Sequence, residues 1–270
     1  MRSPGLRFSV LAAGVALVVV LLSVNPAGAS AAAGTYTCTG GSVPSGTYRS
    51  LVIAGPCAVD SGPVIVRQNV TVLPHADLYA AFGGSNLRAG GNLDVQSGAV
   101  LVLGCEPFAF TCFNDDPNNP TMHTNDVVLG VLTAEGALAV LAHHNRLGGV
   151  VSSSGGGGFN CTPQPALMGS PAYGTYEDNV IEADVSITGW HSCWLGFFRN
   201  TVSSSGNTVD VNYFNNATRD PDGNEVATNT IFGNLRCGGN TPAPQIGDSG
   251  GSLNTVTGAT SGQCIGLVGP

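Results

Sequence analysis

The sequence predicts an all-β protein built from stacked repeats, and three observations lead to this fold class. Residues 69–80 and 92–103 carry the same alternation of apolar and polar side chains, at a spacing of 23 residues. A third copy lies at 131–140. Aligning its Gly136 with Gly98 gives an offset of 38 residues, which is one period plus an insertion of 15. Each copy holds two short apolar runs around a Gly or Pro corner, which indicates two strands and no helix. Because such a unit cannot bury its own apolar edge, it must stack on its neighbours.

Residues 1–31 are predicted to be a secretory signal peptide. Arg2 and Arg7 stand before an apolar run from Phe8 to Leu22, and a tract of small residues follows with an A-x-A cleavage site. A membrane anchor would need about 20 apolar residues, and this run is shorter. We therefore expect a secreted protein, in the medium or at the cell surface, with no membrane span once the leader is removed.

The charge of the mature chain argues against nucleic acid as a partner. Without the leader, 7 basic residues face 17 acidic ones, a net charge of 7 − 17 = −10, and the sequence contains no lysine. Nucleic-acid binding needs a basic surface, which this composition does not supply. An anionic polysaccharide would also be repelled unless calcium bridged it to the protein.

The cysteines indicate an oxidising compartment. All 8 lie after the leader, and an even number in an exported chain favours disulfides. Their order along the chain suggests one of the 105 possible sets of pairs. These pairs are Cys38–Cys57, Cys105–Cys112, Cys161–Cys193 and Cys237–Cys264.

The mature chain divides into an end cap and a run of repeats. We expect residues 32–63, which the first disulfide bounds, to cover the apolar face that the end of a stack would otherwise expose. Residues 64–270 are expected to hold the repeats. Within them, 105–124 is rich in turn formers and lacks a strand pattern, so it is predicted to be an inserted surface loop. The Ser/Gly tract at 152–158 is interpreted as a wide turn between repeats, because the second half of the chain repeats as well.

The repeats of the second half are marked by asparagine. An Asn is followed two positions later by Val or Ile at six places, and three of these lie 22 and 25 residues apart. Asn tolerates left-handed geometry and bonds nearby backbone, so it suits a corner, while the Val or Ile points inward. Asn side chains stacked in successive repeats can also bond one another. The six are Asn179, Asn200, Asn207, Asn224, Asn229 and Asn254.

This pattern resembles right-handed parallel β-helix proteins, a group that includes pectate-lyase-like enzymes, phage tailspikes and bacterial surface proteins. The Asn-x-Val/Ile and Gly-Ala-x-Leu units carry the resemblance, which covers most of residues 50–260. It implies an all-β, single-stranded parallel β-helix with coils of about 22–25 residues. Right-handed winding is expected, because crossovers between parallel strands have that hand in nearly all proteins. Function does not follow from such a fold.

The first candidate for a ligand site is the aromatic segment 189–198, which holds both tryptophans of the chain. Strand alternation would place Trp190, Ser192 and Trp194 on one side. On the surface, the two indoles would form a platform for stacking on a sugar. Inside, they would be a bulky part of the core, which is the commoner place for Trp.

The second candidate is the acidic turn that follows Arg219. Asp220, Asp222 and Glu225 could hold calcium beside the arginine, and calcium is the one cofactor that the sequence suggests. The turn is shorter than the twelve-position calcium loop, and Asp-Pro-Asp-Gly is a strong turn sequence, so an empty turn is the alternative. The turn lies about one repeat after the aromatic segment, so we expect the two to be neighbours along the stack.

We expect a non-catalytic protein of surface binding or adhesion, with carbohydrate as the candidate ligand. One alternative is a polysaccharide lyase or glycoside hydrolase of the parallel β-helix type, and another is a structural envelope protein. The enzyme would require acids and an arginine to converge in one groove, because clustered carboxylates perturb each other's pKa. Asp178, Asp184 and Asp210 could stack on one face. Convergence of Asp184, Asp210 or Asp222 with Arg199 or Arg219 would favour the enzyme.

Overall fold

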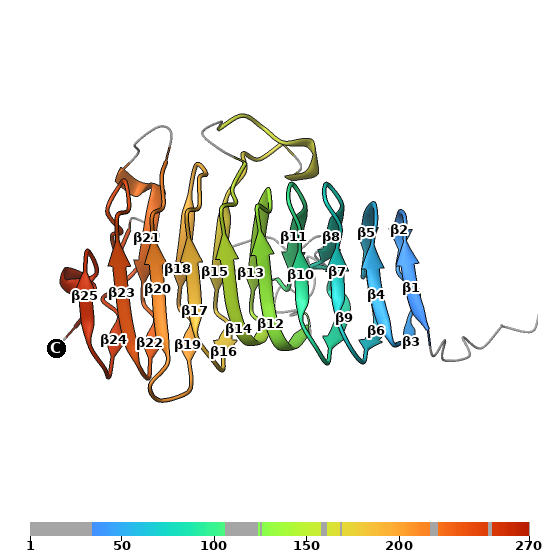
Figure 1. The fold of residues 1–270 in the computed structure, drawn as a ribbon, viewed down its shortest axis with the longest axis horizontal. Coiled ribbons are helices and arrows are strands. Elements are labelled where there is room, and N and C mark those ends of the chain that lie inside the picture. Colours follow the sequence, from blue (N-terminus) through green and yellow to red (C-terminus); the bar gives the residue numbers. More distant parts are fainter. Residues whose placement is uncertain are drawn as a thin grey trace, which may run out of the picture. The chain divides into compact units, whose positions relative to one another are not determined.

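The computed structural model describes residues 34–105, 124, 126–157, 161–167, 169–216, 221–247 and 250–269. The predicted signal peptide and most of the predicted loop at 105–124 lie outside these ranges. The described residues form strands and short 3-10 helices, with no α-helix among them, so the all-β prediction is confirmed. Every strand pair in both sheets is parallel, and successive strands stand side by side along the long axis (Figure 1). No helix in these ranges is long and apolar enough to span a membrane.

The smaller sheet has eight strands. They are β2 (Gly41–Ser42), β5 (Pro56–Ala58), β8 (Asp77–Ala80), β11 (Val100–Leu103), β13 (Ala139–His143), β15 (Gly174–Glu177), β18 (Leu195–Phe198) and β21 (Asn224–Ala227).

The larger sheet has 17 strands and consists of two rows. The first row is β3 (Gly46–Tyr48), β6 (Ser61–Val66), β9 (Gly84–Ala89), β16 (Val180–Ile181), β19 (Thr201–Val202), β22 (Thr230–Ile231) and β24 (Thr255–Val256). The second row is β1 (Thr35–Cys38), β4 (Ser50–Ile53), β7 (Val70–Val72), β10 (Leu93–Val95), β17 (Val185–Thr188), β20 (Thr208–Asn212), β23 (Asn234–Gly238) and β25 (Thr260–Gly262). The long strands β12 (Val127–Glu135) and β14 (Arg146–Ser153) pair with both rows and join them. The 3-10 helices are η1 (Pro165–Leu167), η2 (Pro221–Gly223) and η3 (Ile265–Leu267).

From β1 to β23 the chain visits the three rows in a fixed order, from the second row of the large sheet to the small sheet and then to the first row. Among the described residues, no small-sheet strand lies between β23 and β24. A full repeat therefore passes through three rows of strands, and the prediction of two strands is wrong. Three Asn-x-Val/Ile units predicted from the sequence form the short strands β16, β19 and β22. Their inward residues Ile181, Val202 and Ile231 are fully buried, as expected. β9 was missed because four of its six residues are glycine or polar.

The register confirms the period of 23 between the first two copies, since Leu93 lies opposite Val70. The third copy differs by one residue, because Leu132 lies opposite Leu93, a step of 39 where 38 was predicted. A slip of one would turn every side chain of the strand to the other face, and Leu132 is fully buried in the core. The separation between residues that lie opposite each other on neighbouring strands also falls outside the expected 22–25 elsewhere. Thr35 and Ser50, for example, are 15 residues apart.

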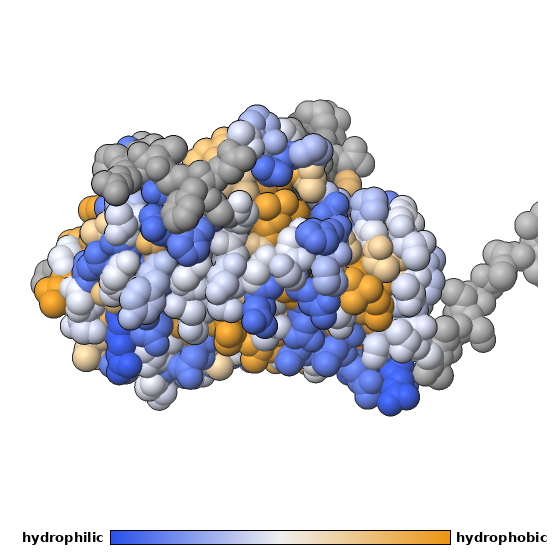
Figure 2. Space-filling model, turned by 45° about the horizontal axis from the view of Figure 1, so that its top comes forward, coloured by the Kyte–Doolittle hydropathy of each residue, from blue (hydrophilic) through white to orange (hydrophobic). Residues whose placement is uncertain are grey.

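The three rows share one apolar core. Alternate residues of each strand point into it, so equivalent positions form continuous stacks from strand to strand. One stack in the second row consists of eight residues in register, each at most 1% exposed. They are Leu51, Val70, Leu93, Leu132, Val150, Val185, Val209 and Leu235. The face shown in Figure 2 is mostly hydrophilic, with apolar residues in separate patches.

Disulfides join neighbouring parts of this arrangement. The structure bonds Cys38 to Cys57, Cys161 to Cys193 and Cys237 to Cys264, which are three of the four pairs suggested by the order of the cysteines. Cys105 is also disulfide-bonded, and Cys112, its expected partner, lies outside the described residues. The segment predicted as a cap, 32–63, supplies β1 to β5 to the two sheets, so strand pairing begins before residue 64.

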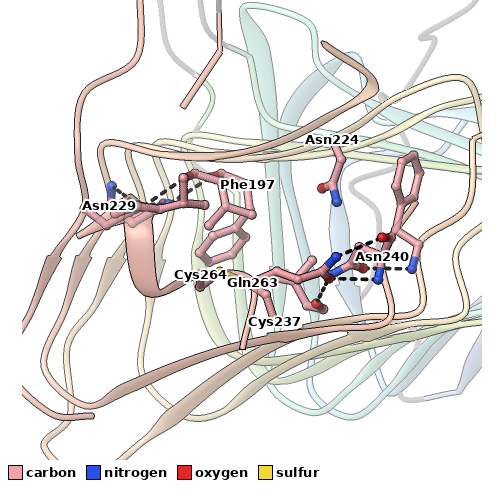
Figure 3. Close-up of a disulfide and its surroundings, with 12 residues drawn as sticks. Phe197, Asn224, Asn229, Cys237, Asn240, Gln263 and Cys264 are labelled. Carbon is pink, nitrogen blue, oxygen red and sulfur yellow. Dashed lines mark hydrogen bonds between the residues drawn. A yellow bond between two sulfur atoms is a disulfide. The ribbon is translucent and has the colours of Figure 1, made fainter. Parts of the chain in front are cut away.

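Five buried asparagines form a continuous ladder at the corner that follows the small sheet. The Nδ2 of each donates to the Oδ1 of the next, at 2.8–3.1 Å. The Nδ2 atoms also donate to backbone carbonyls, as Asn229 does to Phe197 at 2.8 Å (Figure 3). The expectation of stacked asparagines holds for four of the six proposed, whereas Asn207 and Asn224 lie elsewhere. The ladder consists of Asn145, Asn179, Asn200, Asn229 and Asn254.

A second polar corner lies near the C-terminal disulfide. The backbone N–H of Asn240 donates to Gln263 Oε1 at 2.9 Å, and Asn240 Oδ1 accepts from the backbone N–H of Phe214 at 2.9 Å (Figure 3). Cys237 and Cys264, beside them, are bonded to each other. These contacts satisfy buried polar groups where the last strands leave the sheets.

Candidate functional site

Polar and aromatic side chains gather on the outer face of the small sheet at β13, β15 and β18. His143, Glu177 and Phe198 lie side by side in register on these strands. Their chain neighbours Ala142, Tyr176 and Phe197 belong to the apolar core, so alternation turns the first three outward.

The residues that follow these strands adopt left-handed backbone geometry. His144, Asp178, Arg199 and Thr228 have φ between 49° and 60°, and each stands directly before an asparagine of the ladder. Such geometry is uncommon for residues other than glycine and concentrates at functional sites. The ladder therefore holds Asp178 and Arg199 at equivalent corners of adjacent repeats.

Arg199 joins two carboxylates of the preceding repeat. Its Nε lies 2.8 Å from Asp178 Oδ1 and its Nη2 lies 2.6 Å from Asp178 Oδ2, a two-point contact. Nη2 also lies 2.9 Å from Glu177 Oε2. The Arg199 side chain is one-third exposed, so it lies between the two acids and the solvent. Its bonds fix the orientation of both carboxylates.

Glu177 is the least exposed acid of this cluster. Its side chain is 2% exposed, and its Oε1 accepts the hydroxyl of Thr175. Burial raises the pKa of Glu177 to about 7, although the Thr175 hydroxyl and the Arg199 charge both act to lower it. Near neutral pH both the protonated and the ionised form of Glu177 are therefore present, which suits a group that donates and accepts protons.

Two further titratable groups border Glu177. His143 Nε2 lies 4.0 Å from Glu177 Oε1, and burial together with the Arg199 charge lowers the pKa of His143 to about 3. The imidazole is therefore neutral at physiological pH. Burial and the Glu177 charge raise the pKa of Tyr173 to about 12, so its hydroxyl stays protonated.

An aromatic cluster covers the same face. The Trp194 and Phe198 rings stack at 5.4 Å between centroids and 29° between planes, and Tyr173 lies 6.2 Å from Trp194. The stack needs the glycine beneath it, because a Cβ on Gly196 would lie 2.4 Å from Trp194 Cη2. The Arg199 Cζ lies 5.9 Å from the Phe198 centroid, so the guanidinium packs over the same cluster. Trp194 keeps part of its surface open to solvent.

The neighbouring part of the outer face is covered by the chain itself. Leu167 of η1 and Ala172 pack with Val102 and Leu141 in a second apolar cluster over β11 and β13. The Tyr79 hydroxyl donates to the carbonyl of Ala166 at 2.8 Å. The aromatic and acidic groups thus lie beside this cover.

The structure separates the two tryptophans that alternation placed on one side. Trp190 is fully buried in the core, so its predicted role in ligand binding is wrong, whereas Trp194 lies on the outer face. The alternation fails because residues 190–194 are not a strand, and β18 begins only at Leu195.

The predicted acidic turn is described in part. Arg219 and Asp220 lie outside the described residues. Asp222 is exposed and accepts a bond from Gln245 Nε2 at 2.9 Å, whereas Glu225 is 1% exposed on β21. Glu225 lies opposite Gly196, so part of the turn does neighbour the aromatic segment. Within the described ranges, no three His, Cys, Asp or Glu residues are placed to hold a metal.

Of the acids singled out from the sequence, Asp178 meets Arg199, whereas Asp184 and Asp210 have other partners or neighbours. Asp184 accepts from the backbone N–H of Thr208, and Asp210 lies in β20 opposite Arg236. Phe198 lies in the aromatic segment predicted from the sequence, whereas Glu177 and Tyr173 were missed as parts of a site. The signal that could have found the cluster is the ladder, since Asp178 and Arg199 each precede a ladder asparagine.

Comparison of the chain with protein-family models, curated proteins and solved structures finds no match.

Proposed function

We propose that this chain is an exported, right-handed parallel β-helix protein that binds carbohydrate on the outer face of its small sheet. The winding is supported by three rows of parallel strands that the chain visits in a fixed order around one core. Right-handed crossovers are the rule for parallel strands. The three described disulfides support export, because such bonds persist in oxidising compartments.

The observation that carries the proposed ligand is the position of Trp194. Its partly exposed indole stacks on Phe198, next to the guanidinium and carboxylates of Arg199, Asp178 and Glu177. A sugar ring presents an apolar face and a rim of hydroxyls, and an aromatic surface beside charged donors and acceptors complements both.

Glu177 favours a second candidate, a polysaccharide lyase or glycoside hydrolase. A buried carboxyl whose pKa is raised to about 7 suits general acid–base chemistry. In a hydrolase it would need a second carboxylate nearby, and Asp178 and Glu225 are the nearest along the sheet. In a binding protein the same carboxyl would only orient Arg199.

A glycan array probed with the mature protein, with and without calcium, tests the proposal and identifies the ligand. Incubation of each bound glycan with the protein, followed by analysis of chain length, separates the candidates. Intact glycan with saturable binding supports the binding protein, and shortened glycan supports the enzyme. The absence of binding to any glycan would overturn both.

A further inference from the structure

A groove on the large sheet gathers three of the arginines of this acidic chain. It has a volume of about 290 Å³ and lies on the outer face of β6, β9, β12 and β14. Ile65, Arg88, Val127 and Arg146 are in register across these four strands. Val64, Leu87 and Val66 beside them are buried in the core, so the row points outward, and Arg67 and Leu129 complete the lining.

Positive charge is concentrated in this groove, although the chain as a whole is acidic. The sequence has 9 basic residues, all arginine, and a formal charge of −8. Three of the nine line one groove, where a local positive field can attract anions despite the net charge.

The guanidinium groups keep donors available for a ligand. Arg67 forms no ion pair or side-chain hydrogen bond with any described residue. Arg88 uses its Nε for Asn86 Oδ1 at 3.1 Å, which leaves its terminal nitrogens. Arg146 pairs with Glu182, at 2.7 Å from Nε and 2.5 Å from Nη2. Arg67 and Arg88 are therefore the two groups that can form two-point contacts with an oxyanion.

Exposed apolar side chains share the groove with the arginines. Ile65 is 39% exposed and Leu129 is 57% exposed, and both line the groove together with Val127. A purely polar anion would leave these side chains in water, and a neutral apolar molecule would cover the guanidinium groups without bonding them. The lining therefore matches a ligand with both properties.

We propose that this groove binds an amphiphilic organic anion, in which one carboxylate or sulfate group is carried by an alkyl or aryl body. The anionic group is held by Arg67 and Arg88, and the apolar body lies against Ile65, Val127 and Leu129. This site goes beyond the carbohydrate site, because it lies on the other sheet and shares no residue with it.

Isothermal titration calorimetry tests the proposal with octanoate, octyl sulfate, octanol, inorganic sulfate and a polygalacturonate fragment. The two amphiphilic anions are expected to bind, with an affinity that falls as salt is added, and to bind more tightly than the other three probes. Equal affinity for octanol would mean a merely apolar patch. Equal affinity for sulfate or the polar polyanion would mean simple attraction of anions. Either result, or no binding of the amphiphiles, would overturn the proposal.

Variants locate the site. R67Q combined with R88Q is expected to raise the Kd for octanoate about tenfold or more, since each change removes charge-assisted bonds. R236Q, an exposed arginine on β23 outside the groove, is the matched control and should leave the Kd unchanged. Because Arg67 and Arg88 are exposed, the double variant should fold, which circular dichroism verifies. Unchanged affinity in the folded double variant would overturn the assignment.

Discussion

Arg199 Nη2 lies 2.9 Å from Glu177 Oε2, and the same nitrogen lies 2.6 Å from Asp178 Oδ2. One guanidinium thus holds two acids that are adjacent in sequence, one at the end of β15 and one at the left-handed corner that follows it. The arrangement depends on the asparagine ladder, because Asp178 and Arg199 each occupy the left-handed corner before a ladder residue. The corner that closes each repeat therefore also builds the candidate site.

Replacing Glu177 should change how stability depends on pH. Its pKa is about 7 in the folded protein against an ordinary value of 4.5. Between these values the folded protein retains a proton that the unfolded chain has lost, so wild-type stability falls as pH rises through this window. In E177Q that loss is absent. The free energy of unfolding of E177Q relative to wild type should therefore increase by about 2–3 kcal/mol across the window.

Urea denaturation near pH 5 and near pH 8 measures this difference, since the first value lies close to the lower end of the window and the second lies above its upper end. E182Q is the control, because Glu182 is a half-buried acid that also pairs with an arginine. Its curve should run parallel to that of the wild type. A constant difference between E177Q and wild type at both pH values would contradict the raised pKa of Glu177.

Removing one rung of the ladder should destabilise the whole stack. Asn200 is fully buried, and its Nδ2 donates to Tyr176 O at 2.8 Å and to Asn229 Oδ1 at 3.1 Å. Asn200 Oδ1 also accepts from the backbone N–H and the Nδ2 of Asn179. N200A would therefore leave Tyr176 O without this donor and the Asn179 N–H without its acceptor, at about 1–3 kcal/mol for each buried group. We expect the free energy of unfolding to fall by about 3 kcal/mol in chemical denaturation. N207A, at a half-buried asparagine outside the ladder, should cost about 1 kcal/mol or less. Equal losses of unfolding free energy in the two variants would contradict a specific stabilising role of the ladder.

Gly155 should be intolerant of a side chain because Trp190 fills the space beside it. A Cβ at this position would lie 2.2 Å from Trp190 Cζ3. G155A should therefore lower the free energy of unfolding by about 1–3 kcal/mol, the usual cost of overpacking a core. Thermal denaturation compares it with G266A, since no atom lies within 4 Å of a Cβ added at Gly266. A melting temperature of G155A equal to that of G266A would contradict the tight packing of Trp190.

The repeat architecture could be predicted where a strand has a strong apolar alternation. Val70 and Leu93 are in register at the predicted spacing, because both strands carry valine and leucine at alternate positions. The alignment of Gly136 with Gly98 was wrong by one residue, because a turn glycine does not fix the strand register. Burial of Leu132 does fix it. The third strand of each repeat could be located only where an asparagine precedes it, as at Val180–Ile181, because two residues show no period of their own.

The candidate site was harder to predict because it depends on geometry between repeats. Trp190 and Trp194 differ by 4 positions but lie in the core and on the surface, since the intervening residues form no strand. Steps between repeats vary from 21 to 34 residues at the ladder, so no fixed period brings Asp178 to Arg199. The ladder asparagines align the repeats correctly, but this alignment can be recognised only once the bonds between these asparagines are known.

The most direct test of the account is binding of the best glycan from the array to wild type and to W194A by calorimetry. Trp190 is buried, so the wild-type fluorescence change on binding should come from Trp194, and it should saturate at the calorimetric stoichiometry. We expect W194A to bind about tenfold or more weakly, because loss of an aromatic stacking partner costs about that much. Y213A, at a tyrosine that is 66% exposed elsewhere on the molecule, should bind like wild type. Equal affinity of W194A and wild type would contradict a carbohydrate site at Trp194.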